Sequence, residues 1–268
     1  MTKKIVAIGG GENGRTTFSG IKMPYELREI DTEIIKLTGK EKPNFLFLGH
    51  AQNKPEYEEL YFTTMKSIYG DMFGCKCETI KRSELGKNHE HIECLVDWAD
   101  IIYQGGGDTK SMIELWKSTK FDSVLKNAWE MGKVLCGVSA GANCWFKSCS
   151  SDSLKILSND PNASMITVDG LGFVDAFFTP HCNVANESTN RLQHMKDALL
   201  NIDMVGIGIS NCCAIEIIDD TYRLIRCDAS NYGIEAYGIK AYYKNGKYFE
   251  EIIDTDSDFK ILNKLLTK

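Results

Sequence analysis

The sequence lacks any run of 18 apolar residues, so it contains no pattern of a transmembrane helix. It also lacks an excess of positive charge, because 31 lysines and arginines stand against 37 aspartates and glutamates, a net charge of −6. Proteins that bind nucleic acids usually carry basic patches that neutralise phosphates. Blocks of like charge that suggest a membrane surface are missing as well. We therefore expect neither a nucleic acid nor a membrane as partner.

The ten cysteines do not have the spacing of a disulfide framework. His89, His91 and Cys94 come nearest to a metal-binding pattern, but a solvated helix start is the favoured interpretation there. The first apolar run, residues 5–8, is short and ends in glycines, so it predicts a strand and not a secretory signal. We therefore expect reduced thiols and a cytoplasmic protein.

The first two thirds of the chain alternates apolar strands with helical patterns. The predicted strands cover residues 5–8, 45–48, 75–80, 101–103 and 134–138. The predicted helices cover residues 25–37, 56–69, 92–99, 110–118 and 121–131. Continuous apolar strands separated by helices are typical of parallel sheets. We therefore predict an α/β fold with a mostly parallel sheet and helices on both faces.

The last part of the chain, about residues 214–268, has a different pattern. Its predicted elements are strands at 214–218, 222–227, 239–243 and 247–252 and a closing helix at 259–266. The dipeptide Asn245-Gly246 is a strong hairpin signal between the last two strands. Because proline-rich linkers and repeats are missing, we expect one domain, residues 1–268, with a C-terminal antiparallel β extension.

Residues Gly137, Ser139 and Gly141 match the G-x-S-x-G pattern of a nucleophile elbow. A sharp turn from strand to helix exposes the serine hydroxyl, and the helix N-terminus offers free N–H groups to a developing oxyanion. An ordinary strand–turn–helix with a serine N-cap is the plainer alternative. Three further segments favour the elbow, because they follow strands at the edge where parallel sheets bind ligands. These segments are residues 9–11, 49–50 and 105–107.

The glycine clusters also admit other interpretations. Residues 9–14 carry a G-x-G-x-x-G pattern, which in a dinucleotide-binding oxidoreductase opens a helix. Gly20 and Pro24 interrupt the residues that follow, so a crossing loop is favoured. Residues 105–107 open a predicted helix without the Gly-Lys-Ser/Thr of a P-loop, so an oxyanion or anion site is favoured there.

A serine nucleophile needs a base, and the chain offers five histidines. His181 follows an apolar strand and is the preferred candidate. His50 is a second candidate at a strand end, and His194 falls on a predicted helix over residues 191–200. The sequence leaves open which group orients the imidazole. The candidates are Asp152, Asp160, Asp169, Asp175, Asn211, Glu216 and Asp219.

Four segments occur in the order and spacing of one family: residues 105–109, 137–143, 180–181 and 206–209. They read Gly-Gly-Gly-Asp-Thr, Gly-Val-Ser-Ala-Gly-Ala-Asn, Pro-His and Gly-Ile-Gly-Ile. From residue 5 to about 218 the chain resembles the peptidase E (aspartyl dipeptidase) and cyanophycinase family of serine peptidases. The resemblance implies a glutamine-amidotransferase-like, flavodoxin-related α/β sandwich.

The resemblance also implies roles for particular residues. Ser139 becomes the nucleophile and His181 the general base. The oxyanion hole falls at the N–H groups of Gly106 or Gly107 and of Ala140.

This sequence departs from the family pattern at the residue that orients the histidine. Asn211 stands where the family usually has a glutamate, and an asparagine can hold an imidazole but cannot stabilise its positive charge. Asp152 or Glu216 are alternative acids, and Asp152 falls near a family aspartate. Arg191 is the candidate for recognising an acidic side chain of the substrate, and Asp152 is the second residue predicted to bind substrate.

We therefore predict a serine exopeptidase that hydrolyses short peptides, without a metal or organic cofactor and compatible with a homodimer. A catalytically weak or inactive peptide-binding or sensor protein on the same scaffold is the alternative, because Asn211 replaces a carboxylate. A generic α/β-hydrolase esterase is less favoured, because His181 follows Ser139 by only 42 positions.

Overall fold

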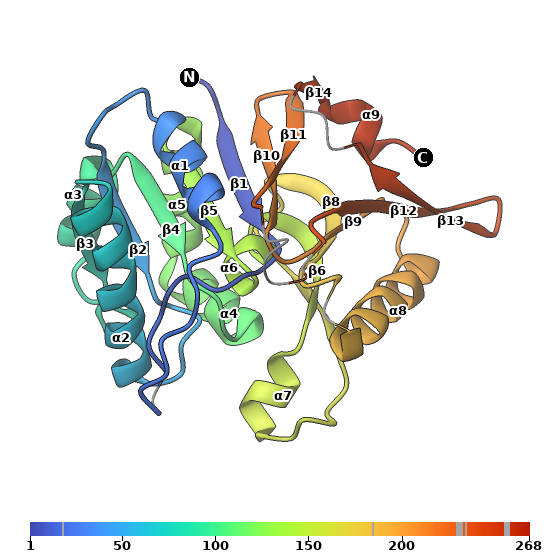
Figure 1. The fold of residues 1–268 in the computed structure, drawn as a ribbon, viewed down its shortest axis with the longest axis horizontal. Helices are drawn as coiled ribbons and strands as arrows, with labels where there is room; N and C mark the ends of the chain where they lie inside the picture. Colours follow the sequence, from blue (N-terminus) through green and yellow to red (C-terminus); the bar gives the residue numbers. More distant parts are fainter. Residues whose placement is uncertain (18, 184, 229–232, 234, 255–257) are drawn as a thin grey trace.

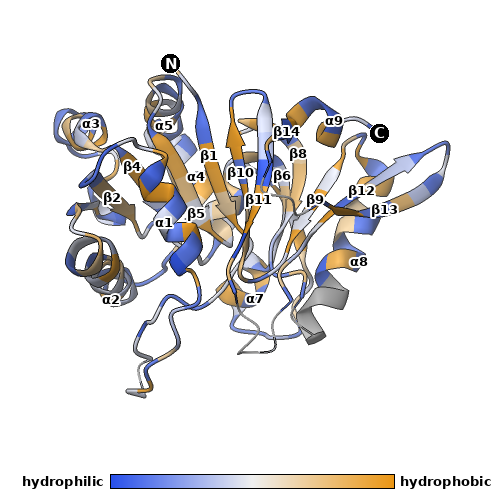
Figure 2. Ribbon diagram, turned by 45° about the horizontal axis from the view of Figure 1, so that its top comes forward, coloured by the Kyte–Doolittle hydropathy of each residue, from blue (hydrophilic) through white to orange (hydrophobic). Residues whose placement is uncertain are grey.

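The structure is a computed structural model, and it describes residues 1–17, 19–183, 185–228, 233, 235–254 and 258–268. Within these residues, two β-sheets lie side by side with helices around them (Figure 1). Figure 2 shows apolar residues concentrated on the central strands and polar residues on the outer turns of the helices. The described helices include none that is long and apolar enough to cross a membrane.

The larger sheet has, among the described residues, eight strands in the order β14-β11-β10-β1-β5-β4-β2-β3. Their bounds are β1 Lys4–Ile8, β2 Asn44–Leu48, β3 Lys76–Ile80, β4 Ile101–Gln104, β5 Val134–Val138, β10 Cys213–Ile218, β11 Thr221–Arg226 and β14 Lys260–Ile261. From β1 to β3 the strands run parallel, whereas β10, β11 and β14 each pair antiparallel. The predicted α/β class, mostly parallel with antiparallel strands toward the C-terminus, is confirmed.

Helices cover both faces of this sheet. Their bounds are α1 Arg28–Lys36, α2 Pro55–Met65, α3 His89–Trp98, α4 Thr109–Thr119 and α5 Phe121–Glu130. On one face, α1 and α2 share a hydrophobic cluster with Val6 and Phe45. On the other face, α3, α4 and α5 share a cluster with the neighbouring strand residues Ala7 and Leu46. Because successive side chains point to opposite faces, a strand covered on both faces needs a continuous apolar run.

The smaller sheet has, in the part of the chain that is described, six strands in the order β13-β12-β9-β8-β6-β7. Their bounds are β6 Phe146–Ser151, β7 Ile166–Asp169, β8 Val174–Thr179, β9 Gly206–Ile209, β12 Gly238–Lys244 and β13 Lys247–Ile253. Its residues Phe146, Phe178 and Ile207 belong to the same cluster as α3 to α5. The sequence predicted the β12–β13 hairpin, but not that it pairs with β9 outside the parallel sheet.

The remaining helical segments are short, apart from one long helix. They are α6 Ala140–Asn143, α7 Ser153–Ser158, α8 Ala185–Asn201, α9 Leu262–Leu266, the π-helix η1 Lys66–Met72 and the 3-10 helix η2 Arg82–Glu84. The helix predicted over residues 259–266 begins only at Leu262, because Lys260–Ile261 pair with β11 as a strand. The predicted helix over residues 191–200 is part of the longer α8.

The segment between β1 and α1 folds as a two-armed flap, which we define as residues 12–26 without residue 18. Isolated bridges join Asn13 to Tyr25 and Thr16 to Lys22, so its two arms run antiparallel. The Glu26 carboxylate accepts a hydrogen bond from the N–H of Glu12 at 2.8 Å. This flap takes the place of the helix that a dinucleotide-binding fold would need, and the crossing-loop interpretation holds.

Candidate active site

Ser139 occupies a strained turn between β5 and α6. Its φ of 56° and ψ of −112° are values that residues other than glycine rarely adopt. The two glycines of the elbow allow the turn to close on β4. A Cβ atom on Gly137 or Gly141 would lie 2.6 or 2.0 Å from the carbonyl oxygen of Gln104. The tight strand–turn–helix expected from the G-x-S-x-G pattern is therefore present, with Ser139 at its bend.

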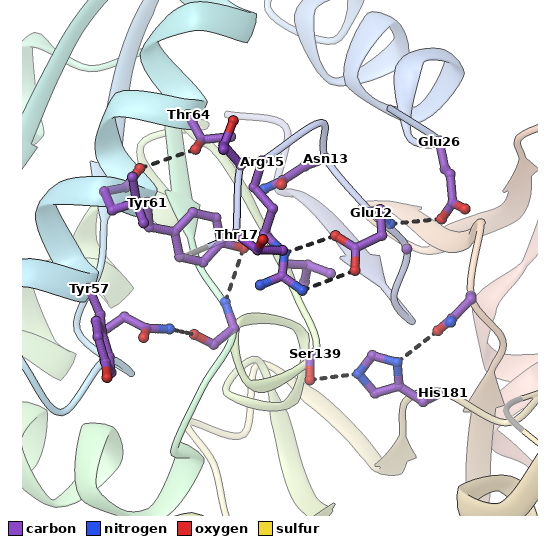
Figure 3. A pocket seen from close by; sticks show the side chains of 17 residues that line it. Glu12, Asn13, Arg15, Thr17, Glu26, Tyr57, Tyr61, Thr64, Ser139 and His181 are labelled. Atoms are coloured by element: carbon purple, nitrogen blue, oxygen red, sulfur yellow. Dashed lines mark hydrogen bonds and ion pairs between the residues drawn. The ribbon is translucent and has the colours of Figure 1, made fainter. Parts of the chain in front are cut away.

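His181 follows β8 of the smaller sheet and reaches Ser139 on the larger one. Its Nε2 lies 2.9 Å from Ser139 Oγ, and its Nδ1 lies 2.7 Å from Asn211 Oδ1 (Figure 3). With Asn211 Oδ1 as acceptor, the imidazole carries its proton on Nδ1. Nε2 is then able to accept a proton from the Ser139 hydroxyl. All three side chains are half-buried.

The carboxyl end of β1 holds the three segments together through consecutive carbonyl groups. Ile8 accepts a hydrogen bond from Ser139 N–H at 3.0 Å, and Gly9 accepts one from His181 N–H at 3.2 Å. Gly10 accepts one from the N–H of the residue after Asn211 at 2.9 Å. A single short stretch therefore sets the mutual position of Ser139, His181 and Asn211.

Gly10 also contacts the histidine directly. A Cβ atom on this residue would lie 2.3 Å from His181 Nδ1 and 2.1 Å from Asn211 Oδ1. Only a glycine leaves room for the imidazole and the amide at this point. The glycine cluster that follows the first strand thus supports the Ser–His–Asn arrangement, a role that the sequence analysis did not assign to it.

The other histidine candidates lie elsewhere. His50 is fully buried, bonded to the Ile80 carbonyl at 2.8 Å and to Trp116 Nε1 at 2.9 Å, and burial lowers its pKa to about 3. It is a structural histidine. His194 is half-buried on α8 and bonded to Ser150 Oγ at 2.9 Å.

The acidic candidates for the third position have other partners. Glu216 is fully buried and paired with Arg223 at 2.6 Å. Asp175 pairs with Lys147 at 2.8 Å, and Asp219 accepts from the N–H of Lys3 at 2.7 Å. Asp160 accepts from Asn162 N–H in its own loop, and Asp169 at the end of β7 accepts from Ser148 Oγ on the neighbouring strand β6.

The predicted oxyanion hole consists of the N–H group of Ala140 with that of Gly106 or Gly107. Gly106 lies beside the nucleophile, because a Cβ atom on it would be 3.4 Å from Ser139 Cβ. Ala140 is the first residue of α6, where a helix leaves its N–H groups without intrahelical partners. Gly107 instead faces Ala51, whose carbonyl oxygen would lie 2.3 Å from a Cβ atom there. The geometry favours Gly106 and Ala140.

A cavity of about 650 Å³ opens in front of Ser139 and His181 (Figure 3). One wall comes from α2, and the facing wall comes from the flap. The lining side chains and backbone groups include Glu12, Asn13, Arg15, Glu26, Gln52, Tyr57, Leu60, Tyr61, Thr64 and Gly106. Arg15 and Glu12 form an ion pair at 2.9 Å on the flap wall. This volume falls in the range of small-ligand sites.

Asp152 and Arg191 lie together, but in another place. They form an ion pair at 2.8 Å, and the Arg191 side chain is 5% exposed. Neither residue belongs to those that line the cavity around Ser139. Their predicted contact with substrate stays a prediction.

The remaining cysteine and histidine patterns form no metal site among the described residues, which contain no group of three or more ligating side chains. His89 begins α3, whose N-cap Asn88 accepts from His91 N–H at 3.3 Å. The favoured interpretation of that stretch, a helix start, is confirmed. All ten cysteines are free thiols.

Comparison with known proteins identifies the family of the chain. The sequence profile of Peptidase family S51 matches residues 16–225. The chain belongs to peptidase family S51. It is 27% identical over 241 residues to an uncharacterized peptidase, YgaJ, of Bacillus subtilis (strain 168), covering 88% of this chain and 92% of that protein. It is 26% identical over 198 residues to Peptidase E of Nostoc sp., covering 72% and 76% of the two chains.

Solved structures give the same assignment for the fold of this S51 family member. A peptidase from an acI-B1 actinobacterium superposes with a TM-score of 0.70 at 20% identity, covering 97% of both chains. A putative peptidase E from Listeria monocytogenes EGD-e superposes with a TM-score of 0.58 at 17% identity, covering 84% of this chain and 99% of that one. The resemblance stated from the sequence motifs is confirmed, and the protein is a peptidase by family.

Proposed function

We propose that this S51 family member is a serine exopeptidase that hydrolyses short peptides. The observation that carries the proposal is the hydrogen-bonded series Ser139–His181–Asn211, with distances of 2.9 and 2.7 Å at the strained turn after β5. A nucleophile bonded to a base, and the base bonded to an orienting group, is the arrangement that acyl transfer requires.

In the proposed reaction, Ser139 Oγ attacks the scissile carbonyl carbon while His181 Nε2 takes the hydroxyl proton. The carbonyl oxygen becomes an oxyanion, and the N–H groups of Gly106 and Ala140 donate to it. One such donor contributes roughly 3–4 kcal/mol to transition-state stabilisation in known enzymes. The C–N bond then breaks, and the leaving amine takes the proton from Nε2. Water hydrolyses the resulting ester with the same imidazole as base.

The shape of the cavity supports short substrates. Its walls come from α2 and from the flap, and the flap side chains Glu12 and Arg15 lie across from Tyr57 and Tyr61 (Figure 3). A few residues of peptide fill a site of this size. A cytoplasmic location and a homodimer belong to the same proposal.

The test compares the wild-type protein with Ser139→Ala on a panel of dipeptides and tripeptides and on a fluorophosphonate probe. We expect the wild type to cleave at least one class of peptide and to be labelled. We expect Ser139→Ala to lose labelling, and its kcat/KM should fall by at least about 1,000-fold. Removal of the nucleophile in known serine peptidases lowers the rate by about this factor or more. Hydrolysis that survives in Ser139→Ala would remove Ser139 as nucleophile.

A second candidate function rests on Asn211. Because an amide cannot stabilise an imidazolium by charge, the same site could bind peptides without cleaving them. A wild type that binds peptides but is inert to the whole panel and to the probe would favour this peptide-binding or sensor role.

A further inference from the structure

Tyr61 lies against the proposed oxyanion hole. Its phenolic oxygen accepts a hydrogen bond from Gly106 N–H at 3.5 Å, and Gly106 lies beside Ser139. Gly105 makes this approach feasible, because a Cβ atom there would lie 2.7 Å from Cε1 of the Tyr61 ring. The tyrosine reaches the site from α2, the wall that faces the flap (Figure 3).

The Tyr61 hydroxyl is a protonated donor held in a fixed position. Burial raises the pKa of Tyr61 to about 12, so the phenol keeps its proton at neutral pH. The ring packs against Phe47 with a centroid distance of 5.0 Å. On the other side of Gly106, Gln52 Nε2 donates to its carbonyl oxygen at 2.6 Å and fixes the peptide group. Little ordering is therefore left to occur when a substrate binds.

We propose that the Tyr61 hydroxyl donates a hydrogen bond to the oxyanion, as a third donor beside the N–H groups of Gly106 and Ala140. This proposal rests on the proposed serine peptidase function. In the free protein, the phenolic oxygen accepts the hydrogen bond from Gly106 N–H. A substrate oxygen that accepts from the same N–H would therefore lie next to the phenolic oxygen. The hydrogen bond that is lost, from Gly106 N–H to the Tyr61 oxygen, is long and weak. The hydrogen bond that replaces it, from the Tyr61 O–H to the oxyanion, is strengthened by the negative charge. Tyr61 thus stabilises the transition state more than the bound substrate.

Tyr242 provides a control outside the cavity. It lies on β12 of the smaller sheet and is not among the residues that line the cavity. Its ring stacks on Phe249 with a centroid distance of 5.4 Å. Substitution of either tyrosine by phenylalanine removes one oxygen atom and keeps the aromatic ring.

The experiment measures kcat, KM, the fluorophosphonate labelling rate and the affinity for a peptide aldehyde, which forms a tetrahedral adduct with a catalytic serine. We expect Tyr61→Phe to lower kcat by about 10- to 100-fold with KM changed less than about threefold. The aldehyde affinity and the labelling rate should fall by a similar factor. Tyr242→Phe should stay within about threefold of the wild type in all four measurements.

Three outcomes overturn the proposal. An active wild type with Tyr61→Phe indistinguishable from Tyr242→Phe, or with a change in KM alone, removes Tyr61 as an oxyanion donor and leaves the peptidase proposal intact. A wild type that is inert to peptides and to the fluorophosphonate overturns both proposals together.

Discussion

At the scale of single residues, local patterns in the sequence predict some members of the candidate site and not others. Ser139 and His181 could be predicted because a G-x-S-x-G turn and a histidine at a strand end are short-range patterns. The choice of Asn211 over several aspartates could not be made from the residues alone. Tyr61 could not be predicted either, because an aromatic residue at helical spacing has the same pattern whether it fills a core or reaches a nucleophile.

Asn211→Asp tests how an amide in place of a carboxylate affects the catalytic rate and its pH dependence. A carboxylate in the same place, 2.7 Å from His181 Nδ1, would favour the charged imidazole. We expect the pKa that governs the acidic limb of the kcat/KM profile to rise by about 1–2 units. Above that pH, kcat should increase about tenfold or more, because the imidazolium formed in the transition state gains a counter-charge. Profiles from pH 5 to 9 measure both effects.

Asn211→Ala serves as the comparison for that substitution. It removes the acceptor without adding charge, so activity should fall at every pH with no displacement of the acidic limb. An Asn211→Asp profile that coincides with the wild-type profile would show that Asn211 does not act on the catalytic imidazole.

At the scale of elements, the parallel strands and their helices were predictable, because buried strands carry continuous apolar runs. The strands β6 and β7 were not predictable in this way. β6 reads Phe-Lys-Ser-Cys-Ser-Ser, and its buried serines are tolerated because they are hydrogen-bonded. Ser150 bonds to Thr179 at 3.0 Å and Ser151 to Ser153 at 2.7 Å. These partners lie on other elements, which a local pattern does not reveal.

Gly10→Ala tests the end of β1 as a positioning element. The added methyl group would overlap His181 Nδ1 and Asn211 Oδ1, so the imidazole must move away from Ser139. A displacement of about 1 Å can cost about 100-fold in rate. We expect a loss in kcat of that size with KM nearly unchanged, together with a slower fluorophosphonate reaction.

The matched control is Gly70→Ala in η1, where the nearest atom to the new Cβ would be Cys77 Sγ at 3.4 Å, an ordinary contact. Thermal unfolding of both variants separates lost activity from lost stability. If Gly10→Ala kept the wild-type kcat, the imidazole would not depend on the end of β1.

At the scale of the whole molecule, the sequence could not assign strands to sheets. The β12–β13 hairpin has a strong local signal at Asn245-Gly246, yet its partner β9 lies about 30 residues earlier along the chain. Pairing over such a separation depends on which apolar faces remain uncovered, and this information is not local. The two sheets were therefore found only in the structure, although their class was predicted.

Global stability should depend on pH through His50. Its pKa is lowered to about 3 in the folded state, mainly by burial, whereas an unfolded histidine has a pKa of about 6.5. Between about pH 6 and 4 the unfolded chain therefore binds one proton more than the folded chain. The contribution of His50 to folding is present above pH 6.5 and is lost as the pH falls.

His50→Gln measures this contribution. As the pH falls from about 6 to 4, the free energy of unfolding of the wild type should decline relative to the variant by about 1.4 kcal/mol per pH unit. Urea unfolding at several pH values gives the difference, in which the titrating groups that both proteins share cancel. Two parallel pH profiles would show that His50 does not titrate with unfolding.

The proposed nucleophile and base come from different sheets. Ser139 follows β5 of the larger one, His181 follows β8 of the smaller one, and carbonyl groups at the end of β1 accept hydrogen bonds from the backbones of both. A chain in which only the larger sheet has formed holds Ser139 without His181. Under the proposed function, cleavage therefore requires both sheets to have docked, and a half-unfolded copy is inactive.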